Sequence, residues 1–316
     1  MILRVVRRLA ILIVSLLVSS ALVFAFMAVL PGDPARVALG VNASEDAVAQ
    51  LRQQFGLDQP LVTQYLDWMR GLLTFHLGDS YVSRAPIGPQ IADRLQVTLW
   101  LVVTATVIAA LIAVPLGVLA ALRHRRPSGL ALSALSQVGV AVPSFLAGIL
   151  LITVFAVELG WLPANGWTPP NVDPVMFVKQ LILPALSLGL VQAAVLTRYV
   201  RSSILDVQGE DYMRTARAKG LSAAAAMRRH GLRNAAIPVV TVLALQLATL
   251  LVGAVVVERV FVIPGLGSLL LDAVGQRDLK IVQDVVMLLV VAVLVVNVVV
   301  DLLYAVIDPR LRVGTR

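Results

Sequence analysis

Residues 95–122, LQVTLWLVVTATVIAALIAVPLGVLAAL, decide the fold of this chain because they contain no acidic or basic side chain. A helix needs roughly 20 apolar residues to cross a bilayer, since all its backbone groups must be hydrogen-bonded within the segment. Further runs without Asp, Glu, Lys or Arg lie at 9–32, 127–157, 180–197, 234–257 and 285–300. The last run reaches spanning length if Asp301 lies inside a helix that ends near Ile307. The sequence therefore predicts an all-α membrane protein with six transmembrane helices.

The composition agrees with this class of protein. Of the 316 residues, 59% are hydrophobic and 14% are charged, whereas a soluble domain carries about 25% charged residues. The apolar core of the first run, 10–30, is too long for a removed signal peptide, and no small-x-small cleavage site follows it. The chain has no cysteine, which excludes disulfides and thiolate metal sites.

The distribution of basic residues predicts the orientation. If the N-terminus is cytoplasmic, the inside segments carry 17 Lys and Arg and the outside segments carry 9. Cytoplasmic segments are enriched in Lys and Arg, so both termini are expected in the cytoplasm. The net charge of +8 then follows from basic loops that face anionic lipid. We therefore expect a lipid membrane as a partner and no nucleic acid.

Two amphipathic helices are expected in the polar region 31–94, between the first and second spans. Ser44 is a suitable N-cap for a helix that ends near Gly56. Pro60 favours the start of a second helix. Together they predict a small helical cap on the external side of the membrane. A short helix is also expected within 259–283, an external segment with Pro264 and Gly265 before an apolar stretch.

The residues needed for several kinds of chemistry are missing. A P-loop needs Gly-Lys-Ser/Thr, but Lys179, Lys219 and Lys280 follow Val, Ala and Leu. The chain is therefore not expected to bind ATP in that way. No histidine lies in a predicted span, which argues against a membrane-embedded enzyme or a histidine proton relay. No catalytic, cofactor-binding or metal-ligating residue is predicted.

One polar pair lies in the sixth predicted span. Asn297 and Asp301 are separated by four positions, so they share one face of a helix. One interpretation is a contact that lines a transport pathway. The other, which we favour, is a polar lock to another helix near the cytoplasmic interface, for example to Arg198 or Arg201.

The loop DYMRTARAKGLSAAAAMRRHGLRNAAIP, residues 211–238, has a basic, helix-forming sequence. A helix over 212–219 is expected to stop at Gly220, and Ser222 can cap a second helix. Two short helices at an angle would form a cytoplasmic knob that fits a groove on a soluble partner. A plain connection between two spans is the alternative.

Several long motifs occur in a fixed order along the chain, namely LPGDP (30–34), FGLDQPLVTQYLDWMRGLL (55–73), VPSFLAGILL (142–151), LGWLPANG (159–166), LPALSLGL (183–190), TRYVRSSILDV (197–207), DYMRTARAKGLS (211–222), RHGLRNAAIPVVT (229–241), VFVIPGLGSLL (260–270) and VNVVVDLLYAVIDPRLR (296–312). In these motifs the sequence resembles the B-type permease subunits of ABC importers for dipeptides, oligopeptides and nickel. The resemblance extends over nearly the whole chain. It implies three parts: the N-terminal segment and first span (1–30), the external cap (31–94), and a permease core (95–316) with an ATPase-coupling loop at 201–235.

The coupling loop departs from the general pattern of the family. The Glu-Ala-Ala-x-x-x-Gly signature falls on Arg214, Thr215, Ala216 and Gly220, so only the Ala and the Gly match. Pro238 also lies further from the glycine than in sugar permeases, as in the peptide branch. The resemblance implies that the residues which contact the ATPase are Asp211, Arg214, Thr215, Ala216, Arg217, Lys219, Gly220 and Leu221.

The resemblance also implies a division of labour in the bacterial inner membrane. A second, homologous permease subunit would complete the pathway, two ABC ATPase subunits would bind ATP and Mg²⁺, and an external binding protein would deliver di- or oligopeptides. A nickel complex is the alternative substrate. An ion-coupled secondary carrier is the alternative from another class. It would need ionisable residues at mid-membrane or paired broken helices, and the charge-free spans argue against it.

Overall fold

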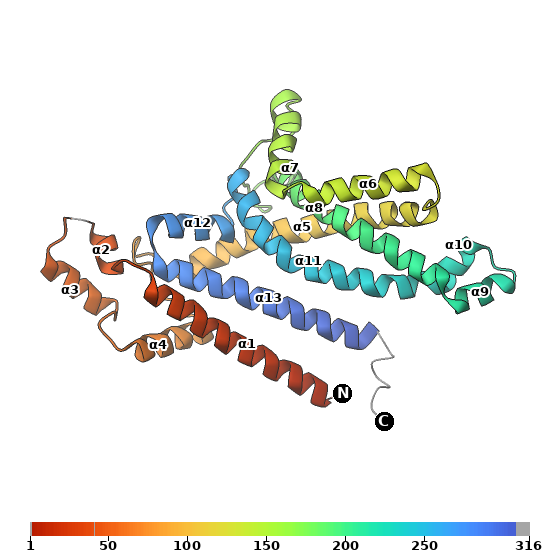
Figure 1. Cartoon of the computed structure of the whole chain (residues 1–316). Coiled ribbons are helices and arrows are strands. Elements are labelled where there is room, and N and C mark those ends of the chain that lie inside the picture. Colours follow the sequence, from red (N-terminus) through yellow and green to blue (C-terminus); the bar gives the residue numbers. More distant parts are fainter. Residues whose placement is uncertain (1, 41, 308–316) are drawn as a thin grey trace. The chain divides into compact units, whose positions relative to one another are not determined.

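The structure, a computed structural model, describes residues 2–40 and 42–307, with side chains over 6–40 and 42–299. Every regular element in this part of the chain is a helix (Figure 1). The chain divides into two compact units. Unit 1 comprises Met1–Thr98 and Pro264–Val295, and unit 2 comprises Leu99–Ile263 and Val296–Arg316.

Five stretches of helix within the described residues are long and apolar enough to cross a membrane. They are Val6–Val29, Ile87–Leu122, Pro174–Gly209, Ala223–Val260 and Leu279–Val299. They correspond to five of the six charge-free runs, so those five predicted spans are confirmed as helices. The all-α class is likewise confirmed for this part of the chain.

The remaining run, 127–157, is not one straight helix. It forms α6 (Pro127–Ala141), α7 (Ser144–Leu151) and the π-helical η1 (Ile152–Glu158), with a bend of 100° between the two halves. The break falls at Pro143, which lacks the N–H that a continuous helix would need. A proline also disfavours helical backbone in the preceding residue, and Val142 is extended. Within the described residues there are six candidate spans if the bent pair counts as one.

Unit 1 begins with α1 (Ile2–Val29) and a set of three short helices. These are α2 (Pro34–Leu39), α3 (Glu45–Gln54) and α4 (Leu61–Thr74). The helices expected near 44–55 and 60–73 are thus present, and Ser44 Oγ accepts a hydrogen bond from the N–H of Ala47 as a helix cap.

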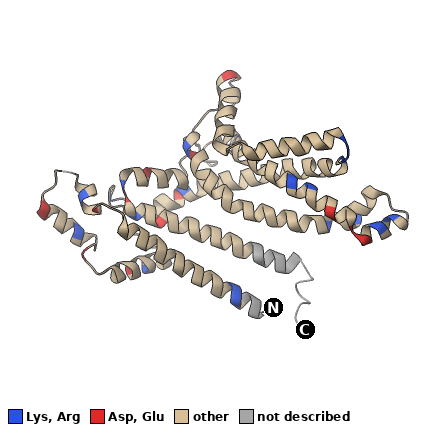
Figure 2. Ribbon diagram, viewed as in Figure 1, with Lys and Arg blue, Asp and Glu red and all other residues tan. Residues whose placement is uncertain are grey.

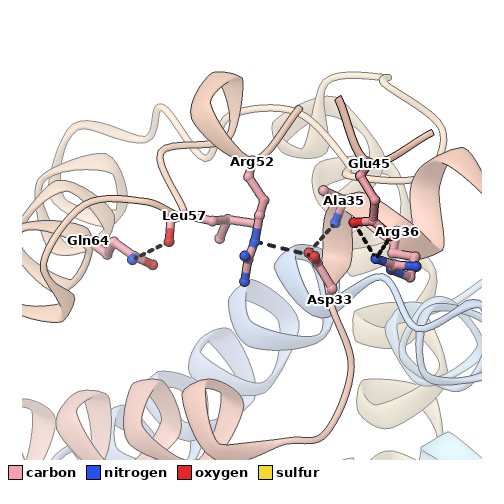
Figure 3. A network of polar contacts seen from close by, with 7 residues as sticks. All are labelled: Asp33, Ala35, Arg36, Glu45, Arg52, Leu57 and Gln64. Atoms are coloured by element: carbon pink, nitrogen blue, oxygen red, sulfur yellow. Dashed lines mark hydrogen bonds and ion pairs between the residues drawn. The ribbon is translucent and has the colours of Figure 1, made fainter. Parts of the chain in front are cut away.

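Ion pairs connect α2 and α3 in this region (Figure 3). Arg36 Nη2 lies 2.7 Å from Glu45 Oε1, and Arg52 Nε lies 3.3 Å from Asp33 Oδ2. Asp33 also caps α2 by accepting a hydrogen bond from the N–H of Ala35. Beneath these contacts lies a small apolar core of Ala35, Val48 and Leu51.

Unit 1 also contains the first part of α5 (Ile87–Leu122), α12 (Leu266–Gln276) and most of α13 (Leu279–Ile307). The short helix expected within 259–283 is α12. An apolar cluster joins α1, α5, α12 and α13, and it includes Ile87, Leu266 and Val285. The Thr98 hydroxyl accepts a hydrogen bond from the N–H of Leu266 at 2.9 Å, which fixes the start of α12.

Unit 2 is a helical bundle in which α8 (Pro174–Gly209) packs against α6, α7 and α11 (Leu232–Val260). Small residues allow α5 and α8 to approach closely. A Cβ on Gly117 would lie 2.5 Å from Val200 Cβ, and one on Gly189 would lie 2.9 Å from Ile108 Cγ2. Packing through small residues is typical of helices in membranes, and here it sets the distance between α5 and α8.

Candidate functional site

The loop between α8 and α11 begins with α9 (Asp211–Ala218), which confirms the helix expected at 212–219. Glu210 is extended and separates α9 from α8. After α9 the chain turns at Gly220, whose φ is +91°. A glycine adopts this backbone conformation without the steric cost that a Cβ would add, so the structure supports the expected stop at this residue.

The second expected short helix is not a separate element. Ser222 caps α10 (Ala223–Ala226) as predicted, through its Oγ and the N–H of Ala225. However, α10 continues through the π-helical η2 (Met227–Gly231) into α11, so 223–260 is one helical span. Pro238 lies inside it. An interior proline removes one helical hydrogen bond and can kink or break a helix, but here α11 continues through Pro238 to Val260.

The α9 helix is anchored to unit 2 by its apolar face. Met213 is 2% exposed and Ala216 is 7% exposed. Both belong to an apolar cluster that includes Ile204 and Val207 of α8 and Met227 of η2. Burial of a side chain such as Met213 stabilises by about 1.5–3 kcal/mol, so α9 is held against the ends of both long helices.

Two hydrogen bonds add to this anchoring. Asn234 Nδ2 donates to the Tyr212 hydroxyl at 2.9 Å and links α11 to α9. The buried Ser203 hydroxyl donates to the carbonyl of Ala235 at 2.7 Å and links α8 to α11. Sequence reasoning missed these residues, because the partners lie 22 and 32 positions apart and no local pattern connects them.

The other face of α9 and the turn after it are polar and exposed. We call this the coupling surface, and its residues are Asp211, Arg214, Thr215, Arg217, Lys219 and Gly220. Arg214 Nη1 lies 3.4 Å from Asp211 Oδ1 in an exposed ion pair. Such a pair stabilises the folded state by about 0–1 kcal/mol. Figure 2 shows basic residues gathered at this end of unit 2.

The eight residues expected to contact an ATPase therefore fall into two groups. Six form the coupling surface. Ala216 is buried in the apolar cluster, and Leu221 is half-buried against it. These two side chains help to fix the loop on the bundle, and packing accounts for a small residue at Ala216.

The polar pair expected on the sixth span is only partly visible. Asn297 lies on α13 and is exposed. The side chain of Asp301 lies outside the described residues. Among the described residues, the Nε of Arg201 is buried and has no hydrogen-bond partner.

A second polar cluster lies in unit 1, around the start of α13. Trp68 Nε1 donates to Asp284 at 2.7 Å, and the Ser80 hydroxyl donates to Asp278. Lys280 Nζ lies 3.7 Å from Asp284 Oδ1. Burial raises the pKa of Tyr81 to about 12, and the negative charges of Asp284 and Asp278 add to that shift. Trp68 and Ser80 are thereby tied by buried hydrogen bonds to Asp284 of α13 and to Asp278, which directly precedes α13.

Comparison with known families decides the identity of the fold. Residues 113–313 match the family described as "Binding-protein-dependent transport system inner membrane component", and residues 1–102 match the N-terminal family of the same membrane components. The chain belongs to this family of ABC-importer permeases. This confirms the resemblance, the multi-pass location in the inner membrane, and the assignment as a transport subunit that is not an enzyme.

Curated relatives extend over the full length of this permease. The glutathione transport system permease protein GsiC of Salmonella typhimurium (strain LT2) is 45% identical over 312 residues, which cover 98% of each chain. The protein of the same name from Escherichia coli (strain K12) gives the same identity and coverage.

Solved structures support the fold. An amino acid ABC transporter is 20% identical with a TM-score of 0.51, covering 68% of this chain and 92% of that one. The MetNI methionine ABC transporter, in an inward-facing conformation, is 18% identical with a TM-score of 0.58, covering 69% of this chain and 96% of that one. At these identities the likeness concerns the fold alone.

Proposed function

We propose that this permease forms half of the translocation pathway for di- and oligopeptides, and that it couples ATPase closure to alternating access. The observation that carries the substrate class is the 45% identity, over 98% of both chains, to permeases named for glutathione. Glutathione is a tripeptide, so this relationship favours a short peptide over a nickel complex.

The coupling surface is the proposed contact with the ATPase. Its charged and polar groups are exposed, while Met213 and Ala216 fix α9 to the bundle. A firmly anchored helix transmits a push better than a flexible loop. ATP-driven closure of the ATPases would then shift α9 together with the ends of α8 and α11, and would rock the bundle between inward- and outward-facing states.

The proposed assembly has a second homologous permease subunit, two ABC ATPase subunits that bind ATP and Mg²⁺, and an external binding protein. This chain needs no cofactor of its own. Its three parts remain those set out from the sequence: residues 1–30, 31–94 and 95–316, with the coupling loop at 201–235. We also propose that Asn297 and Asp301 form a lock near the cytoplasmic ends of the helices.

The orientation belongs to the same proposal. The excess of basic residues in alternate loops supports a cytoplasmic location for both termini and for the coupling surface. The helices α2 to α4 are then external, on the side where a binding protein delivers its substrate. The ATPase and the binding protein would thus act from opposite sides of the membrane.

The test is uptake by the complete complex in sealed vesicles. The permease is purified with its second permease subunit and ATPases and supplied with the binding protein. We expect ATP-dependent uptake of glutathione or trialanine that persists when ionophores abolish ion gradients. Uptake of nickel without uptake of either peptide would contradict the proposed substrate class. Uptake driven by an ion gradient without ATP would contradict the proposed mechanism.

A further inference from the structure

Three polar side chains form a cluster between α8 and α11, in the part of each helix that is otherwise apolar. Gln192 of α8 donates a hydrogen bond from Nε2 to the Thr249 hydroxyl at 3.2 Å. Gln246 of α11 donates from Nε2 to the backbone carbonyl of Gln192 at 3.3 Å. The Thr249 hydroxyl in turn donates to the carbonyl of Gln246 at 2.8 Å.

The cluster lies at the middle of the membrane span. Gln246 is 13 residues after Arg233 and 12 residues before Glu258. At a rise of 1.5 Å per residue, these charged residues lie about 20 Å and about 18 Å away along the helix. Gln192 lies at the same depth because its backbone and side chain bond to α11. In Figure 1, α8 and α11 lie side by side in the bundle.

The hydrogen bonding of the cluster is incomplete. Gln246 is 7% exposed, and its Oε1 has no hydrogen-bond partner among the described residues. A buried acceptor without a partner costs about 1–3 kcal/mol. Gln192 is half-buried and Thr249 is exposed, so one side of the cluster opens to the surroundings of the chain.

Lipid is a poor neighbour for that open side. Hydrocarbon offers no donor or acceptor to an amide, so polar side chains in spans face other helices or a water-filled cavity. The contrast within unit 2 is clear on α5. Its exposed stripe consists wholly of apolar residues, namely Val103, Val107, Leu111 and Val114.

We propose that Gln192, Gln246 and Thr249 line the translocation pathway at mid-membrane and bind the amide groups of a peptide in transit. A carboxamide offers both a donor and an acceptor, as a peptide bond does. Rotation of the Gln246 side chain would bring its unpaired oxygen to a peptide N–H. The cluster carries no charge, so it does not hold the charged termini of a peptide as a fixed ion would. This inference rests on the proposed function.

A cysteine test distinguishes water from lipid at this site. The chain has no cysteine, so Thr249→Cys and a control, Leu111→Cys, each introduce a single thiol. Leu111 is 70% exposed on the apolar stripe of α5, 12 residues from Arg123, which is close to the depth of Gln246. The reagent is a methanethiosulfonate with a fixed positive charge, applied to the complete complex in vesicles.

We expect Thr249→Cys to react at least about tenfold faster than Leu111→Cys, because only the thiolate reacts and a thiol in apolar surroundings does not ionise readily. Equal reactivity of the two would overturn the proposal. So would an unreactive Thr249→Cys, whether the site is covered by lipid or by the second permease subunit.

A second measurement tests the binding role. Gln192→Leu keeps a side chain of similar length on a half-buried position, so the complex is expected to assemble at parental abundance. We expect the KM for trialanine uptake to rise about threefold to tenfold, as for the loss of one hydrogen bond. An unchanged KM, or loss of the complex from the membrane, would overturn this role. A parent complex that transports no peptide would instead refute the proposed function.

Discussion

Gly220 offers the sharpest test of the coupling loop. Its φ of +91° is a conformation that side chains with a Cβ rarely adopt, yet a Cβ built there meets nothing within 4 Å. The cost of Gly220→Val is therefore backbone strain and not a clash. Strain of this kind costs about 1–3 kcal/mol, and a β-branched residue lies toward the upper end.

That cost is large enough to matter for α9. Burial of Met213 stabilises the docked helix by about 1.5–3 kcal/mol, which is the same size as the strain. Each 1.4 kcal/mol changes an equilibrium about tenfold. Gly220→Val is therefore expected to shift much of the population away from the docked loop. Membrane insertion is expected to survive, because the long apolar helices do not depend on this turn.

The assay compares membrane abundance, uptake, and ATP hydrolysis stimulated by the loaded binding protein. Gly209→Val is the matched control, since Gly209 is the last residue of α8, has no positive φ, and also has open space around its Cβ position. We expect normal abundance for both variants and lost coupling only for Gly220→Val. Full coupled uptake by Gly220→Val would show that the loop is only a connector.

Three further predictions concern packing and orientation. Gly117→Ala places a methyl group 2.5 Å from Val200 Cβ, and overpacking of this kind costs about 1–3 kcal/mol. The abundance of the folded chain on immunoblots should therefore fall. Unchanged abundance and thermal stability would contradict the close packing of α5 and α8. Trp68→Phe removes the donor to the buried Asp284 and should lower the free energy of unfolding in detergent by about 1.5–3 kcal/mol, whereas no change would show that the contact is dispensable. A topology reporter inserted after Ala225 should report the cytoplasm, and an external signal there would refute the proposed orientation.

The spans could be predicted because they depend on composition alone. A run without charge that is long enough to cross a bilayer needs no tertiary information, and five runs became single helices. The bend in the run 127–157 could not be predicted from composition. Pro143 was visible in the sequence, but a proline in a membrane helix can give a mild kink or a sharp break, depending on the neighbours that satisfy the freed backbone groups. Only the structure shows the 100° bend.

The coupling loop was predictable as far as its local signals reach. Gly220 and Ser222 are signals that a turn and a cap leave in the sequence, and both were confirmed. The continuation of α10 into α11 was not predictable, because a π-helical turn at Met227–Gly231 has no comparable local signature. The sequence also could not separate the buried Ala216 from its exposed neighbours, since that difference depends on which face of α9 packs on the bundle.

The two proposals converge on the same pair of helices. Met213 packs in one cluster with Ile204 and Val207 of α8 and with Met227, which begins η2 and leads directly into α11. A displacement of α9 would therefore act on α8 and α11 together. The ends of α8 and α11 next to α9 are also joined by the hydrogen bond from the Ser203 hydroxyl to the Ala235 carbonyl.

We infer that α8 and α11 move as one body when the ATPases close, because separating them would break a buried hydrogen bond and expose apolar surface. The cluster of Gln192, Gln246 and Thr249 would then travel with the pair and keep its internal hydrogen bonds. What changes is the side from which water and peptide reach it. The rate of modification of Thr249→Cys from the cytoplasmic side should accordingly differ between the nucleotide-free complex and the complex held closed by a non-hydrolysable ATP analogue. Identical rates in the two states would show that α8 and α11 do not carry the conformational change.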